Sequence, residues 1–257
     1  IGIDVGATKI ESVVLEEDGN EKHRSRTDCP KDYLSIISTI KDIHRNLEKE
    51  FQKELPIGVC HPGIHSPQTG LVKNAPNCYW LEKKPFQSDL RKALGKEVFC
   101  ENDGNCFALS EAIDGAGKHY KIVYGIILGS GAGGGLVIDK QIVSGPNGVA
   151  GEWGHNQIPY FAAKKENFNS NNAREAEVES FISGLGIAKR FNKLYRKNLK
   201  TNEIFELNRK HDLDAERFID EFKLNLAMSL SVVINILDPD AFVFGGGVSN
   251  EIDFLSE

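Results

Sequence analysis

Alternation of apolar and polar positions at the start of the chain predicts strands joined by tight turns. Residues 1–5 form an apolar strand with one inserted acid, and residues 10–16 resume as a second strand after a glycine turn. Residues 17–20 predict a hairpin turn, and residues 21–28 form a third, more polar strand. The chain is therefore expected to open with three strands linked by hairpins.

Helical periodicity takes over after this hairpin region. A helix is predicted to start at Pro30, because residues then recur at spacings of three and four: Leu34, Ile37, Ile40, Ile43 or His44, Leu47 and Phe51. A strand over residues 56–60, a helix over 85–95, a strand over 97–100 and a helix over 106–116 follow, with loop and turn residues over 65–77. Strand and helix thus alternate in the first half.

The second half repeats this order. Strands are predicted over residues 121–128, 133–138 and 142–143, then a helical region from about residue 176 broken at two glycines, a long amphipathic helix over 214–237 and a buried strand over 241–244. Such repetition indicates an internal duplication. We expect an α/β fold with two lobes, residues 1–116 and 117–257, and a central cleft.

Composition narrows the classes of function. The 257 residues are 40% hydrophobic and 26% charged, which is typical of a globular protein, and the net charge of −6 argues against a nucleic-acid partner. No apolar stretch reaches the roughly 20 residues that cross a membrane, and no signal peptide precedes the first strand. The five cysteines form no Cys-x-x-Cys pair, which favours reduced thiols in a cytoplasmic protein.

A short polar stretch at residues 101–105 is the first candidate for chemistry. It places Asn102 and Asp103 after an apolar strand and before a helix. Ligands of open α/β sheets bind at the carboxyl ends of strands, so Asp103 is a candidate general base. The alternative is that Asp103 or Asn102 only caps the following helix, and these five residues alone favour that alternative.

Three glycine-rich turns, at residues 4–9, 129–135 and 245–247, each follow a predicted strand. Glycine lets backbone N–H groups converge on an anion, although a single such turn is more often a plain hairpin. None of the three matches the P-loop or the dinucleotide-binding pattern. Two phosphate-binding hairpins on two lobes would be a different solution to nucleotide binding.

Five motifs follow one another along the chain: Asp4-x-Gly-x-Thr-Lys9, Glu101-Asn-Asp-x-Asn105, Leu128-Gly-Ser-Gly-x-Gly-Gly-Gly135, Gly151-Glu-Trp-Gly-His155 and Phe244-Gly-Gly-Gly247. In this order and spacing they resemble the bacterial ROK family of sugar kinases, repressors and uncharacterised proteins, from end to end of the chain. Residues 72–80, 110–115 and 235–240 are most similar to the fructokinase, or manno(fructo)kinase, branch. Residues 107–112 and the glycine turn are shared with the neighbouring branch of N-acetylglucosamine kinases, which is kept as the alternative.

The resemblance implies an actin/hexokinase-like (ribonuclease H-like) fold and transfer of the ATP γ-phosphoryl group to the 6-hydroxyl of a hexose, here fructose, with mannose or glucose as further acceptors. Asp103 would be the catalytic base. Asp4 would orient Mg²⁺ through water, because Mg²⁺ keeps much of its hydration shell. The nucleotide would be held by three groups of residues: Gly6, Ala7, Thr8 and Lys9; Gly129, Ser130, Gly131, Gly133 and Gly134; and Gly245, Gly246 and Gly247.

The resemblance also implies the sugar-binding residues, which are Gly63, Asn102, Asp103, Glu152, His155 and Glu179. Relatives often close a zinc site with the histidine and three cysteines, but here those cysteine positions hold Ser170, Asn172 and Glu177. Without thiolates a four-coordinate zinc site is not credible, so we expect no bound zinc. A homodimer is the family habit, and a further C-terminal piece is expected beyond residue 257.

Two other classes of function share part of the pattern. A sugar-sensing regulator of the same family would bind ligand without turnover, but such regulators carry an N-terminal helix-turn-helix module, and no residues precede the first strand here. An actin-like ATPase would share the glycine turns but would not explain Glu152, His155 and Glu179. The sugar kinase is therefore the favoured interpretation.

Overall fold

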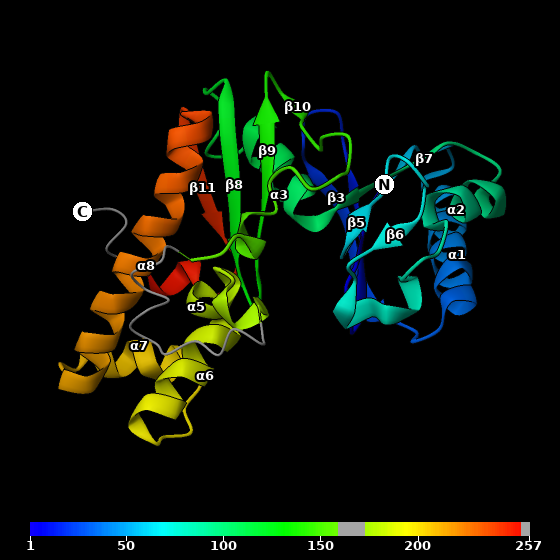
Figure 1. Ribbon diagram of the computed structural model, residues 1–257. Coiled ribbons are helices and arrows are strands. Elements are labelled where there is room, and N and C mark those ends of the chain that lie inside the picture. Colours follow the sequence, from blue (N-terminus) through cyan, green and yellow to red (C-terminus); the bar gives the residue numbers. More distant parts are fainter. Residues whose placement is uncertain (159–172, 253–257) are drawn as a thin grey trace. The chain divides into compact units, whose positions relative to one another are not determined.

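The computed structural model describes residues 1–158 and 173–252 (Figure 1). The chain divides into two compact units, each described here by itself. Unit 1 comprises Ile1–Cys106 and Gly145–Val149, and unit 2 comprises Phe107–Ser144 and Ala150–Glu257. Both contain a mixed sheet with helices, as expected for an α/β protein.

Unit 1 is built on a five-stranded sheet. Its order is β3-β2-β1-β4-β7, with strands β3 (Glu21–Asp28), β2 (Lys9–Leu15), β1 (Gly2–Val5), β4 (Ile57–His61) and β7 (Val98–Asn102). The first three strands pair antiparallel, as the hairpin pattern predicted, while β4 pairs parallel with both β1 and β7. Strand β3 is polar because nearly all of its residues are exposed at the edge of the sheet.

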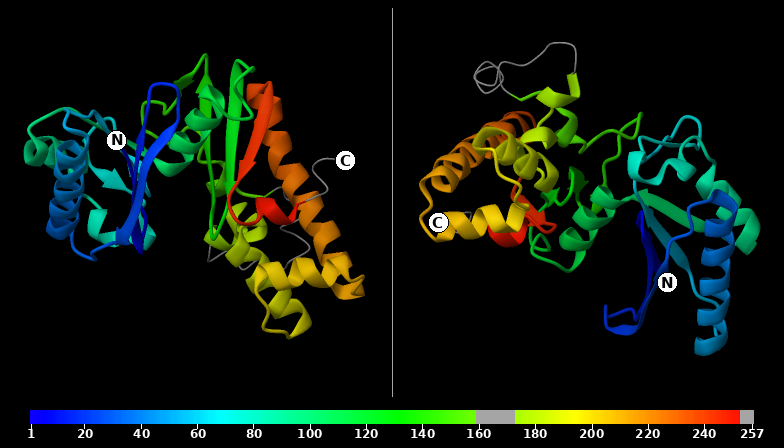
Figure 2. Two further views of the ribbon diagram at one scale, coloured as in Figure 1. Left: turned by 180° about the vertical axis from the view of Figure 1, so that it is seen from behind. Right: turned by 90° about the horizontal axis from the view of Figure 1, so that it is seen from below.

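Two helices, α1 (Tyr33–Phe51) and α2 (Phe86–Leu94), lie side by side against this sheet (Figure 1; Figure 2). Helix α1 begins three residues later than Pro30, because the Asp32 side chain caps it by accepting the Ser35 N–H at 2.9 Å. Of the residues whose spacing predicted this helix, Ile40 and Leu47 are buried, whereas Leu34 is exposed. The predicted helix over 85–95 corresponds closely to α2.

The region predicted as loop and turn after β4 contains short elements. These are β5 (Ile64–His65), β6 (Val72–Lys73) and the 3-10 helix η1 (Pro76–Leu81). Strands β5 and β6 pair antiparallel. Their brevity explains why hydrophobic periodicity did not reveal them.

Unit 2 repeats the strand order of unit 1. Its sheet has the order β10-β9-β8-β11, with β10 (Gln141–Ile142), β9 (Ala132–Ile138), β8 (Ile122–Leu128) and β11 (Ala241–Gly245). Strand β8 pairs antiparallel with β9 and parallel with β11, just as β1 pairs antiparallel with β2 and parallel with β4. The two sheets therefore share the repeated strand order that the sequence predicted.

Helices α5 (Glu179–Ile182), α6 (Gly184–Tyr195), α7 (Thr201–Arg209) and α8 (Leu213–Leu237) belong to unit 2. Helix α8 runs along one side of the sheet (Figure 1; Figure 2), and buried aromatic residues join the helices in one core: Phe181, Phe191, Phe205, Phe218 and Phe222. Helix α7 was not predicted. Within the described residues, no helix has both the length and the apolar character needed to traverse a bilayer.

The remaining elements flank the candidate site. Helix α3 (Asp103–Ile113) follows β7 directly, and the 3-10 helices η2 (Trp153–His155), η3 (Ala173–Ala176) and η4 (Ser249–Glu251) lie in unit 2. The functional division predicted at residues 116 and 117 stays a prediction.

Candidate functional site

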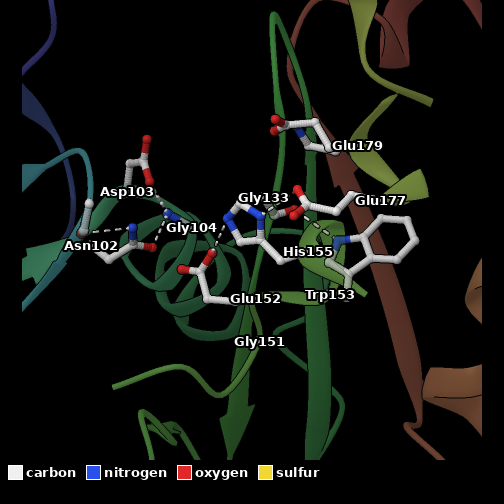
Figure 3. A network of polar contacts seen from close by, with 12 residues as sticks. Asn102, Asp103, Gly104, Gly133, Gly151, Glu152, Trp153, His155, Glu177 and Glu179 are labelled. Atoms are coloured by element: carbon white, nitrogen blue, oxygen red, sulfur yellow. Dashed lines mark hydrogen bonds and ion pairs between the residues drawn. The ribbon is translucent and has the colours of Figure 1, made fainter. Parts of the chain in front are cut away.

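The candidate base lies at the junction of β7 and α3, where strand and helix follow each other without the connecting residues that the sequence predicted. The strand continues to Asn102 and the helix begins at Asp103, so the predicted helix start at Cys106 was three residues too late. The side-chain oxygen of Asn102 explains the difference, because it accepts the N–H groups of Gly104 at 2.8 Å and Asn105 at 3.3 Å (Figure 3). Asn102 thus caps the helix, which was the alternative weighed for this stretch.

Asp103 does not perform that capping. One of its carboxylate oxygens accepts the N–H of the next residue, Gly104, at 2.9 Å (Figure 3). Desolvation raises the pKa of Asp103 above the ordinary value, and the negative charge of Asp4 raises it further, while the Gly104 N–H lowers it. The residue as a whole is nevertheless exposed.

Asp4 lies at the end of β1, two strands from β7 in the same sheet. Desolvation raises the pKa of its carboxyl group, a hydrogen bond with the Cys60 thiol lowers it, and the charge of Glu11 raises it. Asp4 is exposed, and its carboxylate offers the hard oxygen donors that Mg²⁺ prefers. The residues present therefore fit a hydrated magnesium ion.

Gly63 supports the β7–α3 junction from the loop after β4. Its carbonyl accepts the side-chain N–H of Asn102 at 3.1 Å. The φ angle of Gly63 is +83°, and a Cβ atom there would lie 2.6 Å from the carbonyl oxygen of Lys73. Only glycine fits this backbone, so Gly63 holds Asn102 through its main chain.

The first glycine turn joins β1 to β2. The Gly6 N–H donates to the carbonyl of Lys9 at 2.9 Å, which closes the turn and engages the Gly6 amide. Lys9 forms an ion pair with Asp28 of β3, and Thr8 is exposed. Ala7 is half-buried and packs against the core of unit 1. The turn is therefore folded tightly before any phosphate reaches it.

The second glycine turn lines a pocket in unit 2. The pocket has a volume of about 590 Å³ and includes Gly129 and Ser130 of this turn together with Gly247 after β11. Gly246 has φ +88°, and a Cβ atom there would lie 2.5 Å from the Leu128 carbonyl oxygen. Two of the three predicted glycine segments thus meet at one pocket.

Several pocket residues were missed by sequence reasoning. They come from the first turns of α6 and α7 and from the segment after β11: Gly184, Leu185, Ala188, Leu199, Lys200, Thr201, Asn202, Val248 and Glu251. The Thr201 hydroxyl donates to the Gly184 carbonyl at 2.6 Å and so joins the starts of the two helices. The sequence predicted a break at two glycines in the helical region where α6 begins, but nothing in the residues before α7 indicated a pocket.

Glycines explain how residues 151–155 lie against β9. A Cβ atom at Gly134 would come within 2.8 Å of the Gly151 carbonyl oxygen, and one at Gly154 within 2.0 Å of the Ala132 carbonyl oxygen. The Trp153 indole N–H donates to the Gly133 carbonyl at 3.0 Å (Figure 3). The Tyr124 hydroxyl donates to the Gly151 carbonyl at 2.9 Å. Gly133 and Gly134 therefore belong to strand β9, and residues 151–155 pack against this strand.

His155 lies between two acids. Its Nδ1 atom is 3.1 Å from a carboxylate oxygen of Glu177, and its Nε2 atom is 3.8 Å from one of Glu152 (Figure 3). Ser170 and Asn172, which stand at two of the three cysteine positions implied by the resemblance, lie outside the described residues. Glu177, which stands at the third, pairs directly with the His155 side chain. No group of three potential metal ligands occurs among residues 1–158 and 173–252.

Glu179, at the start of α5, contacts the second glycine turn. Its Oε2 atom accepts the Ala132 N–H at 2.8 Å, and a Cβ atom at Gly131 would lie 2.6 Å from the same oxygen. The Gly245 backbone is similarly close to a side chain, because a Cβ atom there would lie 2.6 Å from the ring of Phe107. Each predicted residue is thus located, and its chemical role stays a prediction.

Comparison with known proteins shows the family to which the chain belongs. The model of the ROK family matches residues 1–257. An N-acetyl-D-glucosamine kinase of Histophilus somni (strain 129Pt) is 36% identical over 263 residues, covering 100% of this chain and 86% of that protein. This finding does not support the predicted fructokinase branch, and it favours the alternative that was kept beside it.

Two solved structures are also similar. A ROK hexokinase from Thermus thermophilus has a TM-score of 0.85 and 25% identity, covering 97% of this chain and 82% of that one. A ROK family glucokinase from Streptomyces griseus in complex with glucose and AMPPNP has a TM-score of 0.75 and 26% identity, covering 97% and 83%. The predicted hexokinase-like α/β fold is confirmed.

Proposed function

The chain belongs to the ROK family and is an ATP-dependent sugar kinase, and on that premise we propose that its acceptor is N-acetyl-D-glucosamine, phosphorylated at the 6-hydroxyl. The observation that carries the choice of acceptor is the 36% identity, over the whole chain, to a protein named N-acetyl-D-glucosamine kinase. The structures named hexokinase and glucokinase are less similar in sequence, at 25% and 26% identity.

Asp103 is the proposed general base. Its carboxylate is proposed to accept the proton of the acceptor hydroxyl as the phosphoryl group is transferred, and the hydroxyl oxygen becomes the nucleophile. The supporting observations are the fixed position of Asp103 at the first turn of α3 and the raised pKa of its carboxyl group. A raised pKa makes the carboxylate a better proton acceptor.

Unit 2 is proposed to hold the nucleotide. The pocket beside Gly129, Ser130 and Gly247 has the size of a small-molecule site and is lined by backbone-rich turns and two helix starts. Mg²⁺, when bound, would neutralise phosphate charge, and Asp4 would hold it through water. Thr8 and Lys9 are proposed to contact phosphate, in which case Lys9 would exchange its partner Asp28 for the nucleotide.

The side chains proposed to bind the acceptor hydroxyls are Asn102, Asp103, Glu152, His155 and Glu179. Carboxylates, an amide and an imidazole can each donate to or accept from paired hydroxyls. Gly63 contributes indirectly, because its carbonyl accepts a hydrogen bond from the Asn102 side chain. A homodimer and a cytoplasmic location remain part of the proposal, and sedimentation of the purified protein tests the former.

An ADP-release assay tests the choice of acceptor. The purified protein is supplied with Mg·ATP and, separately, N-acetylglucosamine, N-acetylmannosamine, glucose, mannose and fructose. We expect kcat/KM to be highest for N-acetylglucosamine. A higher value for fructose would reinstate the fructokinase branch, and a higher value for glucose would align the protein with the hexokinase and glucokinase structures.

A further inference from the structure

The turn between β8 and β9 has little structure of its own. One hydrogen bond, from the Gly129 N–H to the Gly131 carbonyl at 2.9 Å, closes it. Glycine has more backbone freedom in the unbound state than any other residue, so a glycine turn loses more entropy when it is ordered around an anion. A turn that binds phosphate well must therefore be held in shape by its surroundings.

The segment from Glu179 to Leu185 provides that support. The Gly184 N–H donates to the Gly129 carbonyl at 2.8 Å, and the Leu185 N–H lies 3.4 Å from the Ser130 carbonyl oxygen. Both contacts use the main chain at the start of α6. The third contact uses a side chain, because Glu179 Oε2 accepts the Ala132 N–H at 2.8 Å.

The Glu179 carboxylate also occupies the space beside Gly131. A methyl group added there would meet Oε2 at 2.6 Å, well inside van der Waals contact. The φ angle of Gly131 lies outside the left-handed region, so alanine could adopt this backbone. A methyl group at position 131 would therefore have to displace the Glu179 carboxylate, and the backbone conformation alone does not demand glycine.

We propose that Glu179 is a positioning residue for the nucleotide, whose carboxylate holds the β8–β9 turn in the shape that receives phosphate. This inference rests on the proposed function, which assigns the turn to the nucleotide and Glu179 to the acceptor. It adds a second duty to Glu179, performed by Oε2, and leaves Oε1 for an acceptor hydroxyl. Since one carboxylate then serves both ligands, acceptor and nucleotide affinities are linked reciprocally through it.

Direct binding of Mg·ADP without sugar tests the proposal, measured by isothermal titration calorimetry. Glu179→Ala removes the acceptor of the Ala132 N–H and is expected to weaken Mg·ADP binding about tenfold, the effect typical of losing a hydrogen bond to a charged group. Glu179→Gln keeps an oxygen that can accept this N–H and is expected to bind within about threefold of the wild type. Glu175→Ala, which removes an exposed acid four residues earlier, controls for loss of charge.

A double-mutant cycle separates the shape of the turn from a general loss of folding. Gly131→Ala is expected to weaken Mg·ADP binding in the wild-type background, because its methyl group displaces the carboxylate. In the Glu179→Ala background the methyl group has room, so the second substitution should add little further loss. Melting curves identify any variant that is unfolded. Mg·ADP affinities are then compared among the variants that fold.

Three outcomes distinguish the possibilities. Unchanged Mg·ADP affinity in Glu179→Ala, with a raised KM for sugar alone, overturns the positioning role. Equal losses in Glu175→Ala and Glu179→Ala also overturn it, because charge alone would explain them. A wild-type protein that binds Mg·ADP but does not phosphorylate N-acetylglucosamine refutes only the proposed acceptor, whereas one that binds no Mg·ADP refutes the nucleotide site and this role together.

Discussion

His155 and Glu177 form a direct pair, with Nδ1 of the imidazole 3.1 Å from Oε2 of the carboxylate. Main-chain hydrogen bonds reinforce it: the Ile158 N–H donates to the Ala176 carbonyl at 2.8 Å, and the Val178 N–H donates to the Asn156 carbonyl at 2.8 Å. Glu177 stands where the resemblance implied a zinc-binding cysteine. The pair therefore joins two segments that a metal ion would otherwise join.

The first prediction concerns this pair. Glu177→Ala leaves the His155 Nδ1 without its partner, so the imidazole becomes free to turn away from the acceptor. We expect KM for the acceptor to rise about five- to tenfold, as for one side-chain hydrogen bond, with Mg·ADP affinity unchanged. Steady-state kinetics with the acceptor varied, together with calorimetry, measure both quantities.

Glu177→Gln is the matched control, because its amide oxygen can still accept the Nδ1 proton. Its KM should lie between those of the wild type and Glu177→Ala. If both variants keep the wild-type KM, the pair does not position His155 for the acceptor.

The second prediction is that the purified protein carries no stoichiometric zinc. Ser170, Asn172 and Glu177 offer no thiolate, and a structural zinc site with one histidine needs further strong ligands. Elemental analysis by mass spectrometry measures the metal directly. A zinc-specific chelator, with Mg²⁺ kept in excess, should leave activity and the melting temperature unchanged. One zinc per chain would show that other residues close the site.

The third prediction concerns the base. Asp103→Asn keeps the size of the side chain but cannot accept the proton, so kcat should fall about a thousandfold or more while acceptor binding persists. Isothermal titration calorimetry measures whether the variant still binds the acceptor. A variant that retains wild-type turnover would exclude Asp103 as the base.

The raised pKa of Asp103 also predicts two pH effects. Because the carboxylate is the active form, kcat/KM should fall as the pH drops through a value above the ordinary 3.8 of an aspartate. Ionisation is disfavoured in the folded protein, so Asp103→Asn should raise the melting temperature at neutral pH. That gain should vanish below pH 3.8, where the carboxyl group is protonated in both the folded and unfolded states.

The fourth prediction compares two glycines in left-handed conformations. Gly63 has φ +83° and a carbonyl oxygen 2.6 Å from the position of an added Cβ, whereas Gly70 has φ +68° with no atom within 4 Å. Gly70→Ala should lower the free energy of unfolding by about 1–2 kcal/mol, the strain of the conformation alone. Gly63→Ala should lower it by several kcal/mol, because the clash adds to the strain. Urea titration measures the difference, and equal losses would mean that the loop relaxes around the methyl group.

The sequence predicted most strands well because alternation and tight turns are local signals. The helix start at Asp103 was misplaced, since Gly104 and Asn105 are typical turn residues, and only the position of the Asn102 side chain makes them helical. The contact between Glu179 and Ala132 spans 47 residues along the chain, and no periodicity could reveal it. The pocket residues at the start of α7 are equally non-local.

The pocket proposed for the nucleotide has a consequence for how this protein could diversify. All of its lining residues belong to unit 2, and Asn102 and Asp103 belong to unit 1. Under the proposed assignment, substitutions at the openings of α6 and α7 would alter contacts with the phosphate donor without touching Asp103, the proposed base. The preference for a donor would then be open to selection or design at residues other than Asp103 and Glu179, the residue proposed to serve both ligands.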